Sequence, residues 1–402
     1  MGAPAGCEGR PWVSSDSATC RDASIGVYLH SPFCVSHCTY CDFYTRAFNG
    51  ESQVRAFARA LAEGIRLSSQ DLQVAGRSVD TVYFGGGTPS LLTAGDLETV
   101  MQALHAAFRL EPGAEISIEA NPESVTQEKL ADFRSLGINR LSLGVQSFQP
   151  AILETLGRAH SAQRARQAFQ EARRAGFENV SFDLMLALPG QNLEILNQDL
   201  TTAADLAPDH LSAYLLEMDK ETALRARIER GELKPPTEDE AADMYERTCS
   251  SLTRAGFRHY ELSNFALPGK ECRHNLKYWT DLPFVGFGPS AWSYLDGRRF
   301  REAADLEGYL DAVRRGAAPK REVTEGEARE RIDEALFAGL RLVDGVDLAN
   351  LGRNYGVEDP LGDRRQAVSD LEEAGFVSLE GGRLRLTRRS YPIANEIFQV
   401  FV

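Results

Sequence analysis

The sequence predicts an α/β protein: a partial (β/α)6 barrel of the TIM type, followed by a C-terminal winged-helix-like α+β domain. Three observations support this prediction. Short β-rich runs alternate with amphipathic helical stretches up to about residue 216, and the loops that follow the strands are polar or glycine-rich. Near the C-terminus, two helical stretches precede a short β-ribbon. The 402 residues are enough for two or three domains.

Six barrel strands are expected, and six is too few to close a complete barrel. They are Ile25–His30, Val79–Phe84, Glu115–Glu119, Arg140–Val145, Asn179–Met185 and His210–Leu216. Capping residues mark the starts of helices between or after them: Thr93 with Asp96, Ser161, and Thr237 with Glu240. In such a barrel the carboxyl ends of the strands meet on one open face, where sites are built.

The chain divides into four expected segments. They are a flexible leader over residues 1–24, the barrel over 25–220, an extension over 221–327 and the C-terminal domain over 328–402. In the last segment, helices over Ile332–Leu342 and Arg365–Ala374 precede a ribbon of residues 376–386, which is the order of a winged helix. DNA binding by this domain is disfavoured because its basic cluster is short: Arg385, Arg388 and Arg389.

Composition narrows the possible partners. The net charge is −14 and the sequence pI is about 5.1, so an extended nucleic-acid-binding surface is not expected. The sequence has no apolar run near the roughly 20 residues that a transmembrane helix needs, and the N-terminus has no basic region followed by an apolar segment. We therefore expect a cytoplasmic protein without a transmembrane segment.

A group of three cysteines, Cys34, Cys38 and Cys41, is the strongest motif of the chain. Three thiolates can hold a metal centre and leave one position open, as in an iron–sulfur cubane with a free iron. Structural zinc is the alternative, but no second Cys/His pair with zinc-finger spacing follows.

Four further cysteines complete the seven of the chain. Cys7 and Cys20 in the leader are interpreted as incidental thiols, and Cys249 as a buried structural thiol on a helix. Cys272 is a minor candidate for a heme ligand.

The loops after the predicted strands carry the remaining candidates for a single binding site. The second strand leads into Gly85-Gly86-Gly87-Thr88, the third ends at Glu119, the fourth leads to Gln146, and the fifth carries Asp183. Consecutive glycines let a small ligand approach the backbone, where N–H groups can bind a carboxylate and C=O groups an ammonium group. Each of these loops is also compatible with an ordinary strand-to-helix turn.

The CxxxCxxC spacing, with Tyr40 before the last cysteine and the strand Ile25–His30 before the motif, resembles the radical S-adenosylmethionine (SAM) enzymes. The resemblance implies a [4Fe-4S] cluster on the three cysteines, with the amino and carboxylate groups of SAM on the fourth iron. An electron from the cluster then cleaves SAM to a 5′-deoxyadenosyl radical. A partial barrel of the radical SAM type is the fold that this resemblance implies.

Further motifs are similar to those of the HemN-like branch of this superfamily: GGGTPS, IEANP, GVQSF, GRAH and FDLMLALPGQ. The resemblance assigns SAM to Tyr28, Tyr40, Gly86, Gly87, Thr88, Glu119, Gln146, Arg158 and Asp183. Glu119 suits the ammonium group, Arg158 a carboxylate and Asp183 the ribose hydroxyls. The alternatives are a solvated helix face for Arg158 and a helix cap for Asp183. This branch uses its C-terminal domain as a lid or scaffold.

Two features distinguish the members of the branch. Coproporphyrinogen dehydrogenases carry another cysteine two positions after the last ligand, where this chain has Phe43. The hexapeptide from His274 to Trp279 matches the HNxxYW motif, which is linked to heme binding in the HemW family of heme chaperones. The resemblance assigns heme to His274, Asn275, Tyr278 and Trp279. A neutral imidazole is a good axial ligand, although a lone histidine is usually a satisfied polar residue.

We therefore expect a heme chaperone of the HemW type that binds heme and a SAM-ligated [4Fe-4S] cluster and transfers heme to an acceptor protein. Respiratory-chain proteins are plausible acceptors, and an electron donor is needed if SAM is cleaved. Two alternatives remain open: an oxygen-independent coproporphyrinogen III dehydrogenase, which decarboxylates propionates by radical chemistry, and a HemN-like radical SAM methyltransferase. The barrel motifs are common to all three.

Overall fold

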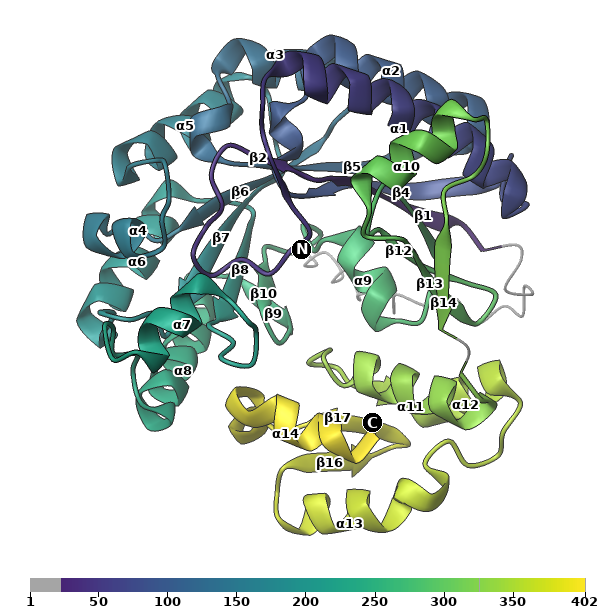
Figure 1. Cartoon of the computed structure of the whole chain (residues 1–402). Helices are drawn as coiled ribbons and strands as arrows, with labels where there is room; N and C mark the ends of the chain where they lie inside the picture. The colour runs from purple at the N-terminus through teal and green to yellow at the C-terminus, as the bar shows by residue number, and fades with distance from the viewer. Residues whose placement is uncertain (1–22, 325, 402) are drawn as a thin grey trace, which may run out of the picture.

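The computed structural model describes residues 23–324 and 326–401 of the chain (Figure 1). The predictions for Cys7 and Cys20 concern the leader and lie outside the described residues. Within the described part of the chain, no helix is both long and apolar enough to cross a membrane.

Six adjacent parallel strands form the partial barrel, in the order β1-β4-β5-β6-β7-β8. They are β1 (Ile25–Ser31), β4 (Ser78–Gly86), β5 (Arg109–Ala120), β6 (Arg140–Gln146), β7 (Val180–Leu186) and β8 (His210–Leu215). The predicted fold class and all six predicted strands are confirmed. The main difference is β5, which begins six residues before the predicted Glu115.

The segment predicted as an extension adds strands to both edges of this sheet. On one side, β11 (Phe284–Phe287) runs parallel to β1 and is followed by antiparallel strands β12 (Trp292–Leu295), β13 (Arg298–Glu302) and β14 (Arg321–Thr324). On the other side, β8 pairs antiparallel with β10 (Asn264–Ala266), which pairs with β9 (Arg258–Glu261). The result is one 12-stranded sheet. Two short strands, β2 (Phe33–Cys34) and β3 (Arg46–Ala47), pair separately.

Helices cover the outer face of the barrel (Figure 1). The helices up to the C-terminal domain are α1 (Glu51–Asp71), α2 (Ala94–Ala107), α3 (Gln127–Ser135), α4 (Pro150–Thr155), α5 (Ala162–Arg174), α6 (Leu193–Leu206), α7 (Ala223–Glu229), α8 (Glu238–Arg254), α9 (Arg273–Trp279) and α10 (Leu306–Arg314). The predicted capping boxes of Thr93 and Thr237 are present, and Ser161 accepts a hydrogen bond from the N–H of Arg164. The predicted helix starts are therefore confirmed.

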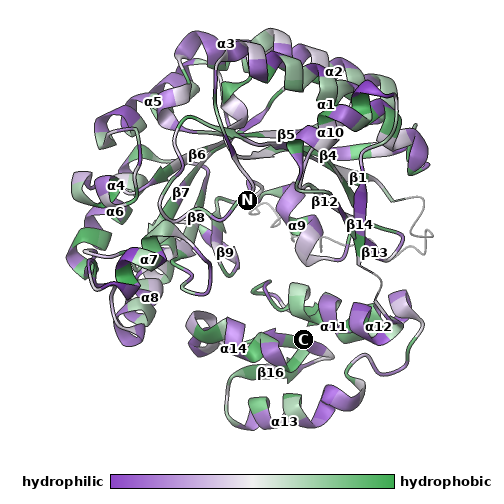
Figure 2. Cartoon of the chain, viewed as in Figure 1, coloured by the Kyte–Doolittle hydropathy of each residue, from purple (hydrophilic) through white to green (hydrophobic). Residues whose placement is uncertain are grey.

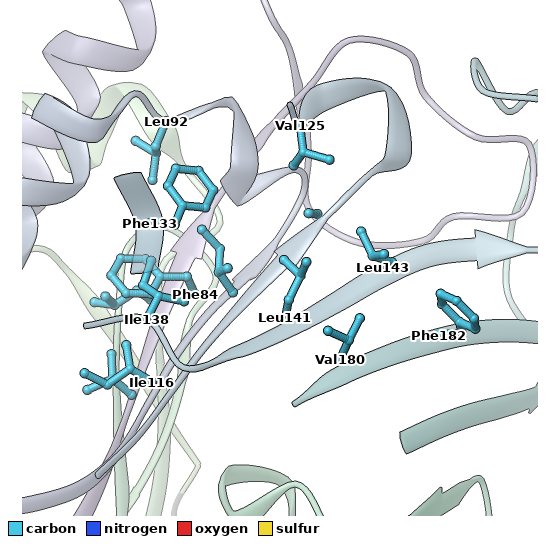
Figure 3. Packing of buried hydrophobic residues seen from close by; sticks show 14 of the residues in the cluster. Phe84, Leu92, Ile116, Val125, Phe133, Ile138, Leu141, Leu143, Val180 and Phe182 are labelled. Atoms are coloured by element: carbon cyan, nitrogen blue, oxygen red, sulfur yellow. The ribbon is translucent and has the colours of Figure 1, made fainter. Parts of the chain in front are cut away.

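The outer face of the strands forms the main hydrophobic core together with these helices. Phe84, Ile118, Leu141 and Phe182 are at most 1% exposed and belong to the cluster drawn in part in Figure 3. Full burial of each such side chain contributes about 1.5–3 kcal/mol to folding. In Figure 2 the outer helices carry both hydrophobic and hydrophilic residues, as expected for amphipathic helices that cover a sheet.

Because side chains alternate along a strand, the residues between these core positions face the barrel interior. The register places Gly26 beside Thr81 and Tyr28 beside Tyr83 on β1 and β4. The next strand continues both rows, with Glu115 beside Thr81 and Ser117 beside Tyr83. Two residues further along β5, Glu119 pairs with Ser142 of β6. The interior is therefore lined with polar and aromatic side chains in successive rows, and the last row lies at the carboxyl ends.

The C-terminal domain has its own hydrophobic cluster, which includes Leu336, Leu384 and Phe398. Its elements are α11 (Ala328–Gly339), β15 (Val346–Asp347), α12 (Leu348–Tyr355), α13 (Arg365–Glu373), β16 (Val377–Glu380), β17 (Arg383–Leu386) and α14 (Ala394–Phe398). Strands β15, β17 and β16 form a three-stranded sheet, so the order of elements is that of a winged helix. Short 3-10 helices cover 89–91, 122–124, 362–364, 388–393 and 399–401.

Candidate functional site

The three cysteines lie in and just after the short strand β2, in a loop at the carboxyl end of β1. All three thiols are partly buried. Backbone hydrogen bonds fix the loop from two sides: the N–H of Thr39 donates to the carbonyl of Leu156 at 3.1 Å, and the carbonyl of Thr39 accepts from the N–H of Leu224 at 2.6 Å. The loop between Cys38 and Cys41 is therefore tied to the ends of α4 and α7.

A chain of hydrogen bonds links two of the thiols. Arg158 donates from Nη1 to Sγ of Cys38 at 3.3 Å and from Nη2 to Oδ1 of Asn121 at 2.5 Å. Asn121 donates in turn to Oγ1 of Thr88 at 3.1 Å, and Thr88 donates to Sγ of Cys34 at 3.5 Å. Donors directed at sulfur stabilise thiolates, and hydrogen bonds to cluster sulfurs are one of the means by which proteins set a cluster potential.

Burial works in the opposite direction at the thiols. It raises the pKa of Cys34 and raises the pKa of Cys41 to about 11, so without a metal the neutral thiols are favoured. Iron must bind the thiolate form, and its positive charge supplies the compensation. Among the described residues, no three His, Cys, Asp or Glu side chains are placed to hold a single ion. In a cubane each thiolate binds a different iron, so the three sulfurs need not converge on one point.

The glycine loop after β4 corrects one part of the sequence interpretation. The N–H of Gly86 donates to Oε2 of Glu119 at 3.1 Å, that of Gly87 to the carbonyl of Ser31 at 2.7 Å, and that of Thr88 to the carbonyl of Phe33 at 2.8 Å. These N–H groups are therefore used within the protein, and the prediction that the loop offers free N–H groups to a carboxylate is wrong for them.

Gly86 and Gly87 are needed because other parts of the protein pack closely against the loop at these positions. A Cβ on Gly87 would lie 2.8 Å from the carbonyl oxygen of Phe33 and 3.0 Å from Sγ of Cys34. A Cβ on Gly86 would lie 2.6 Å from the ring of His30, and this glycine also has a φ of +109°. The glycines thus allow β4 to approach the cysteine loop and the His30 ring closely.

Glu119 lies at the carboxyl end of β5 and faces the barrel interior. Its Oε1 accepts a hydrogen bond from the hydroxyl of Tyr83 at 2.9 Å, in addition to the bond from Gly86. Burial, together with the smaller effect of the nearby carboxylate of Asp183, raises the pKa of Glu119 to about 7. A partly buried carboxylate of this kind is a favourable partner for an ammonium group, because the pair offsets the cost of desolvation.

The other predicted polar residues, Asp183, Gln146 and Arg158, come from β7, β6 and the loop after α4. Ser142 donates to Oδ1 of Asp183 at 3.1 Å, and burial raises the pKa of that carboxylate. Gln146 ends β6 with a φ of +65° and is 8% exposed. Arg158 is additionally fixed by a 2.8 Å bond from Nη2 to the carbonyl of Gly144. The structure therefore places Arg158 beside the cysteine loop, not on a solvated face, and Asp183 within a strand, not at a helix cap.

The two predicted tyrosines come from different segments of the chain. Tyr28 is on β1, and its hydroxyl is 3.1 Å from Nδ1 of His30. Tyr40 lies in the cysteine loop and packs against a small apolar cluster that contains Leu156 and Leu224. The nine residues predicted for SAM thus come from the cysteine loop, the loop after α4, the middle of β1 and β7, and the carboxyl ends of β4, β5 and β6 with the loop after β4.

The HNxxYW hexapeptide lies elsewhere, on helix α9. A Cβ on Gly26, near the start of β1, would come within 3.1 Å of the His274 ring. The His274 side chain is fully buried, with Nδ1 at 2.9 Å from Oγ1 of Thr81 and Nε2 at 2.9 Å from the hydroxyl of Tyr278. Burial lowers the pKa of His274 to about 3, so the imidazole is neutral. Both ring nitrogens are engaged in this arrangement.

Of the other members of the hexapeptide, Tyr278 contacts the sheet and Trp279 contacts the C-terminal domain. The ring of Tyr278 packs edge-on against Phe284, and the guanidinium of Arg341 lies 4.6 Å from the ring centre of Trp279. Asn275 is half-buried on the same helix. Cys272, just before the helix, is fully buried, and burial raises its pKa to about 12. It is therefore poorly suited to act as a thiolate ligand.

The sequence did not lead us to three residues that contact the predicted SAM residues: Asn121, Tyr83 and Ser142. Asn121 follows the third predicted strand directly and belongs to the polar strand ends that were recognised as a group. Tyr83 and Ser142 occupy interior positions within strands, where period-two alternation places them on the same face as Glu119 and Asp183. That alternation was the signal that could have identified them.

Comparison with protein-family models finds two matches. Residues 28–203 match the radical SAM superfamily, and residues 327–392 match the HemN C-terminal domain. The first range contains the cysteine loop and all the strand ends described above, and the second contains most of the C-terminal domain.

Comparison with individual proteins gives matches over nearly the whole chain. The chain is 34% identical over 378 residues to a heme chaperone HemW of Bacillus subtilis, covering 93% of this chain and 98% of that protein. It is 38% identical over 379 residues to a heme chaperone HemW of Mycobacterium tuberculosis, covering 94% of each. Among solved structures, coproporphyrinogen III oxidase (HemN) from Escherichia coli has the same fold, with a TM-score of 0.82 at 23% identity, covering 95% of this chain and 90% of that one.

Proposed function

This chain belongs to the HemW family of the radical SAM superfamily, and from that premise we propose that it is a heme chaperone, which binds heme and passes it to an acceptor protein. The observation that carries the proposal is the identity of 34% and 38% to proteins named as heme chaperones, over at least 94% of their lengths. The fold alone does not distinguish a heme chaperone from coproporphyrinogen III oxidase, because both proteins have the same fold.

We assign a [4Fe-4S] cluster to Cys34, Cys38 and Cys41. The donor set fits such a cluster, because the thiols are partly buried in one loop and two of them accept hydrogen bonds, from Thr88 and Arg158. When bound, the cluster supplies a single electron and one iron that the protein leaves free for the amino and carboxylate groups of SAM.

The SAM site comprises nine residues in this proposal, and their charges match the cofactor. They are Tyr28, Tyr40, Gly86, Gly87, Thr88, Glu119, Gln146, Arg158 and Asp183. Glu119 accepts the α-ammonium group, Arg158 faces the carboxylate, and Asp183 binds the ribose hydroxyls. The glycine loop contributes carbonyl oxygens, since the N–H groups of Gly86 and Gly87 are used within the protein.

Heme is assigned to His274, Asn275, Tyr278 and Trp279 on α9. A neutral imidazole beside two aromatic side chains suits an iron porphyrin. Because both nitrogens of His274 are hydrogen-bonded, α9 has to shift before the ring can ligate iron. The acceptor is a heme-requiring apoprotein, for which respiratory-chain proteins are plausible, and an electron donor is needed only if SAM is cleaved. We place the protein in the cytoplasm because its clustered cysteines suit a reducing compartment.

The test is an anaerobic hemin titration of cluster-containing protein, followed by the Soret band. We expect wild type to bind hemin, His274→Ala to bind it more weakly by at least about tenfold, and apomyoglobin to withdraw the heme. In a parallel reaction with coproporphyrinogen III, SAM and a reductant, we expect no decarboxylated product.

Two results would favour the other members of the branch. A decarboxylated porphyrinogen without a stable heme band indicates the dehydrogenase, and a methylated product indicates the methyltransferase. Phe43 supports the chaperone against the dehydrogenase: it occupies the position of the additional cysteine and is 65% exposed on the cluster loop. A Phe43→Cys variant is expected to remain unable to decarboxylate coproporphyrinogen III.

A further inference from the structure

The imidazole of His274 is packed against two aromatic side chains of the barrel interior, those of Tyr83 and Tyr28. Its ring stacks with that of Tyr83 at a centroid distance of 5.3 Å and an interplanar angle of 26°. Tyr28 completes the group, at 6.4 Å and 28° from His274 and 6.2 Å and 23° from Tyr83. The three rings therefore support one another inside the barrel, at the level between α9 and the carboxyl ends of the strands.

Little space is left for these rings to move independently. A Cβ on Gly85 would lie 2.9 Å from the Tyr28 ring and 3.0 Å from the Tyr83 ring, so the backbone of β4 holds both tyrosines at van der Waals contact. On the other side, Thr81 and Tyr278 hold the His274 ring through its two nitrogens. A displacement of the His274 ring thus removes packing from Tyr83 directly.

Tyr83 carries this packing to the cofactor site through its hydroxyl. That hydroxyl donates to Oε1 of Glu119 at 2.9 Å, while the N–H of Gly86 donates to Oε2 at 3.1 Å. One of the two hydrogen bonds that orient the Glu119 carboxylate therefore depends on where the Tyr83 ring lies. Glu119 is the residue that receives the ammonium group of SAM in the proposed function.

We propose that His274 and Tyr83 are positioning residues for Glu119, so that heme bound through His274 and SAM bound through Glu119 weaken each other's binding. This inference rests on the proposed function. Heme ligation requires one ring nitrogen of His274 to leave its hydroxyl partner and the ring to move, which withdraws support from Tyr83. By linkage, SAM then binds best to the closed arrangement of α9 and opposes heme to the same extent.

The decisive measurement uses cluster-containing protein without reductant, so that SAM is not consumed. Hemin is titrated with and without saturating SAM, and SAM binding is measured by equilibrium dialysis with and without saturating hemin. We expect each ligand to weaken the other by the same factor, about fivefold or more, as is typical of coupled sites. Binding of both ligands with affinities unchanged within about twofold overturns the inference. If the proposed function itself is wrong, the result is distinguishable, because the wild-type protein then binds no hemin in either titration.

Variants separate positioning from a general effect on the fold. His274→Phe keeps a ring in the stack and His274→Ala removes it; we expect the alanine variant to bind SAM several-fold more weakly and the phenylalanine variant to stay close to wild type. Equal SAM affinity in the alanine variant and wild type, although His274 has been removed, contradicts the inference. If His274→Ala does not fold, Tyr83→Phe still tests the second step, from the Tyr83 hydroxyl to Glu119.

Tyr83→Phe retains the stacked ring and removes only the hydroxyl that donates to Glu119. We expect it to weaken SAM binding by about 2–12-fold, the usual range for one hydrogen bond, and to reduce the coupling between heme and SAM. The matched control is Tyr309→Phe, since the hydroxyl of Tyr309 is buried and, among the described residues, has no hydrogen-bond partner. That control is expected to bind SAM as wild type does, whereas equal losses in both variants overturn the role of Tyr83.

Discussion

The carboxylate of Glu115 accepts a hydrogen bond from the backbone N–H of His274 at 3.1 Å. The same carboxylate accepts a second bond, also 3.1 Å, from the N–H of Arg273. Glu115 lies on β5, so a residue of the barrel wall caps the first turn of α9 and compensates its free N–H groups. The helix that carries the proposed heme ligand is thus fastened to the barrel at its N-terminus.

Replacement of Glu115 by Gln should loosen α9. An amide has one acceptor oxygen, so one of the two backbone bonds is lost together with the favourable charge at the helix start. We expect amide hydrogen exchange across α9 to accelerate by about 5–30-fold, corresponding to about 1–2 kcal/mol. The measurement is hydrogen exchange with mass spectrometry of peptides that cover residues 272–280. Exchange in α9 that matches wild type would argue against the capping role. The control is Glu98→Gln, an exposed residue of α2.

Arg158 is expected to set the potential of the cluster. Its guanidinium donates to Sγ of Cys38, and a cationic donor at a cluster sulfur favours the reduced, more negative state. Arg158→Met should therefore lower the reduction potential, by about 50–100 mV for the loss of one charged hydrogen bond. An EPR-monitored redox titration without SAM gives the value. The control is Arg166→Met, whose guanidinium lies over Phe148. A potential that is unchanged in Arg158→Met contradicts the assignment.

Asp183 is expected to contribute to SAM affinity through its charge. Asp183→Asn keeps the size of the side chain and its contact with Ser142, but replaces a charged acceptor of two ribose hydroxyls by a neutral amide. We expect SAM binding to weaken by about 10–100-fold while cluster content stays at the wild-type level. Equilibrium dialysis measures the SAM affinity, and analysis of iron and sulfide measures the cluster content. Wild-type SAM affinity would remove Asp183 from the site.

The sequence was sufficient for the parts of the fold that depend on local signals. The six strands were recognised from β-rich runs and the helix starts from Thr93, Ser161 and Thr237, because alternation and capping act within a few residues. The edge strands β9 to β14 were not predicted. They are three to five residues long. β10 joins β8 and β11 joins β1 across large distances in sequence, so no local pattern specifies where these strands attach to the sheet.

The same distinction applies to the site. Residues at strand ends, such as Glu119 and Gln146, could be grouped from sequence because parallel strands share one carboxyl edge. The use of the Gly86 N–H by Glu119 and the bonds on both nitrogens of His274 depend on contacts between distant segments. The three glycines therefore correctly indicated that another group lies close to the backbone of this loop. They did not reveal that this group belongs to the protein itself.

The burial of the Glu302 carboxyl group leads us to predict that the stability of the protein depends on pH. It is 1% exposed, accepts hydrogen bonds from the N–H of Gly288 at 2.8 Å and from Ser68 at 3.2 Å, and burial raises its pKa to about 8. In the unfolded chain a glutamate titrates near 4.3. The folded state therefore binds the proton more tightly, and the stability that Glu302 contributes is fully present below about pH 4 and is lost as the pH rises to about 8.

Glu302→Gln removes this titration while keeping an acceptor for Gly288. We expect the variant to gain stability relative to wild type as the pH is raised from 5 to 9, by about 4 kcal/mol, because each of the roughly three pH units between pH 5 and the folded pKa corresponds to about 1.4 kcal/mol. The measurement is the difference in Tm between variant and wild type at pH 5, 7 and 9 under anaerobic conditions. The exposed Glu98→Gln serves again as the control and should give a difference independent of pH. A constant Tm difference for Glu302→Gln would show that the buried carboxyl group is not protonated preferentially in the folded state.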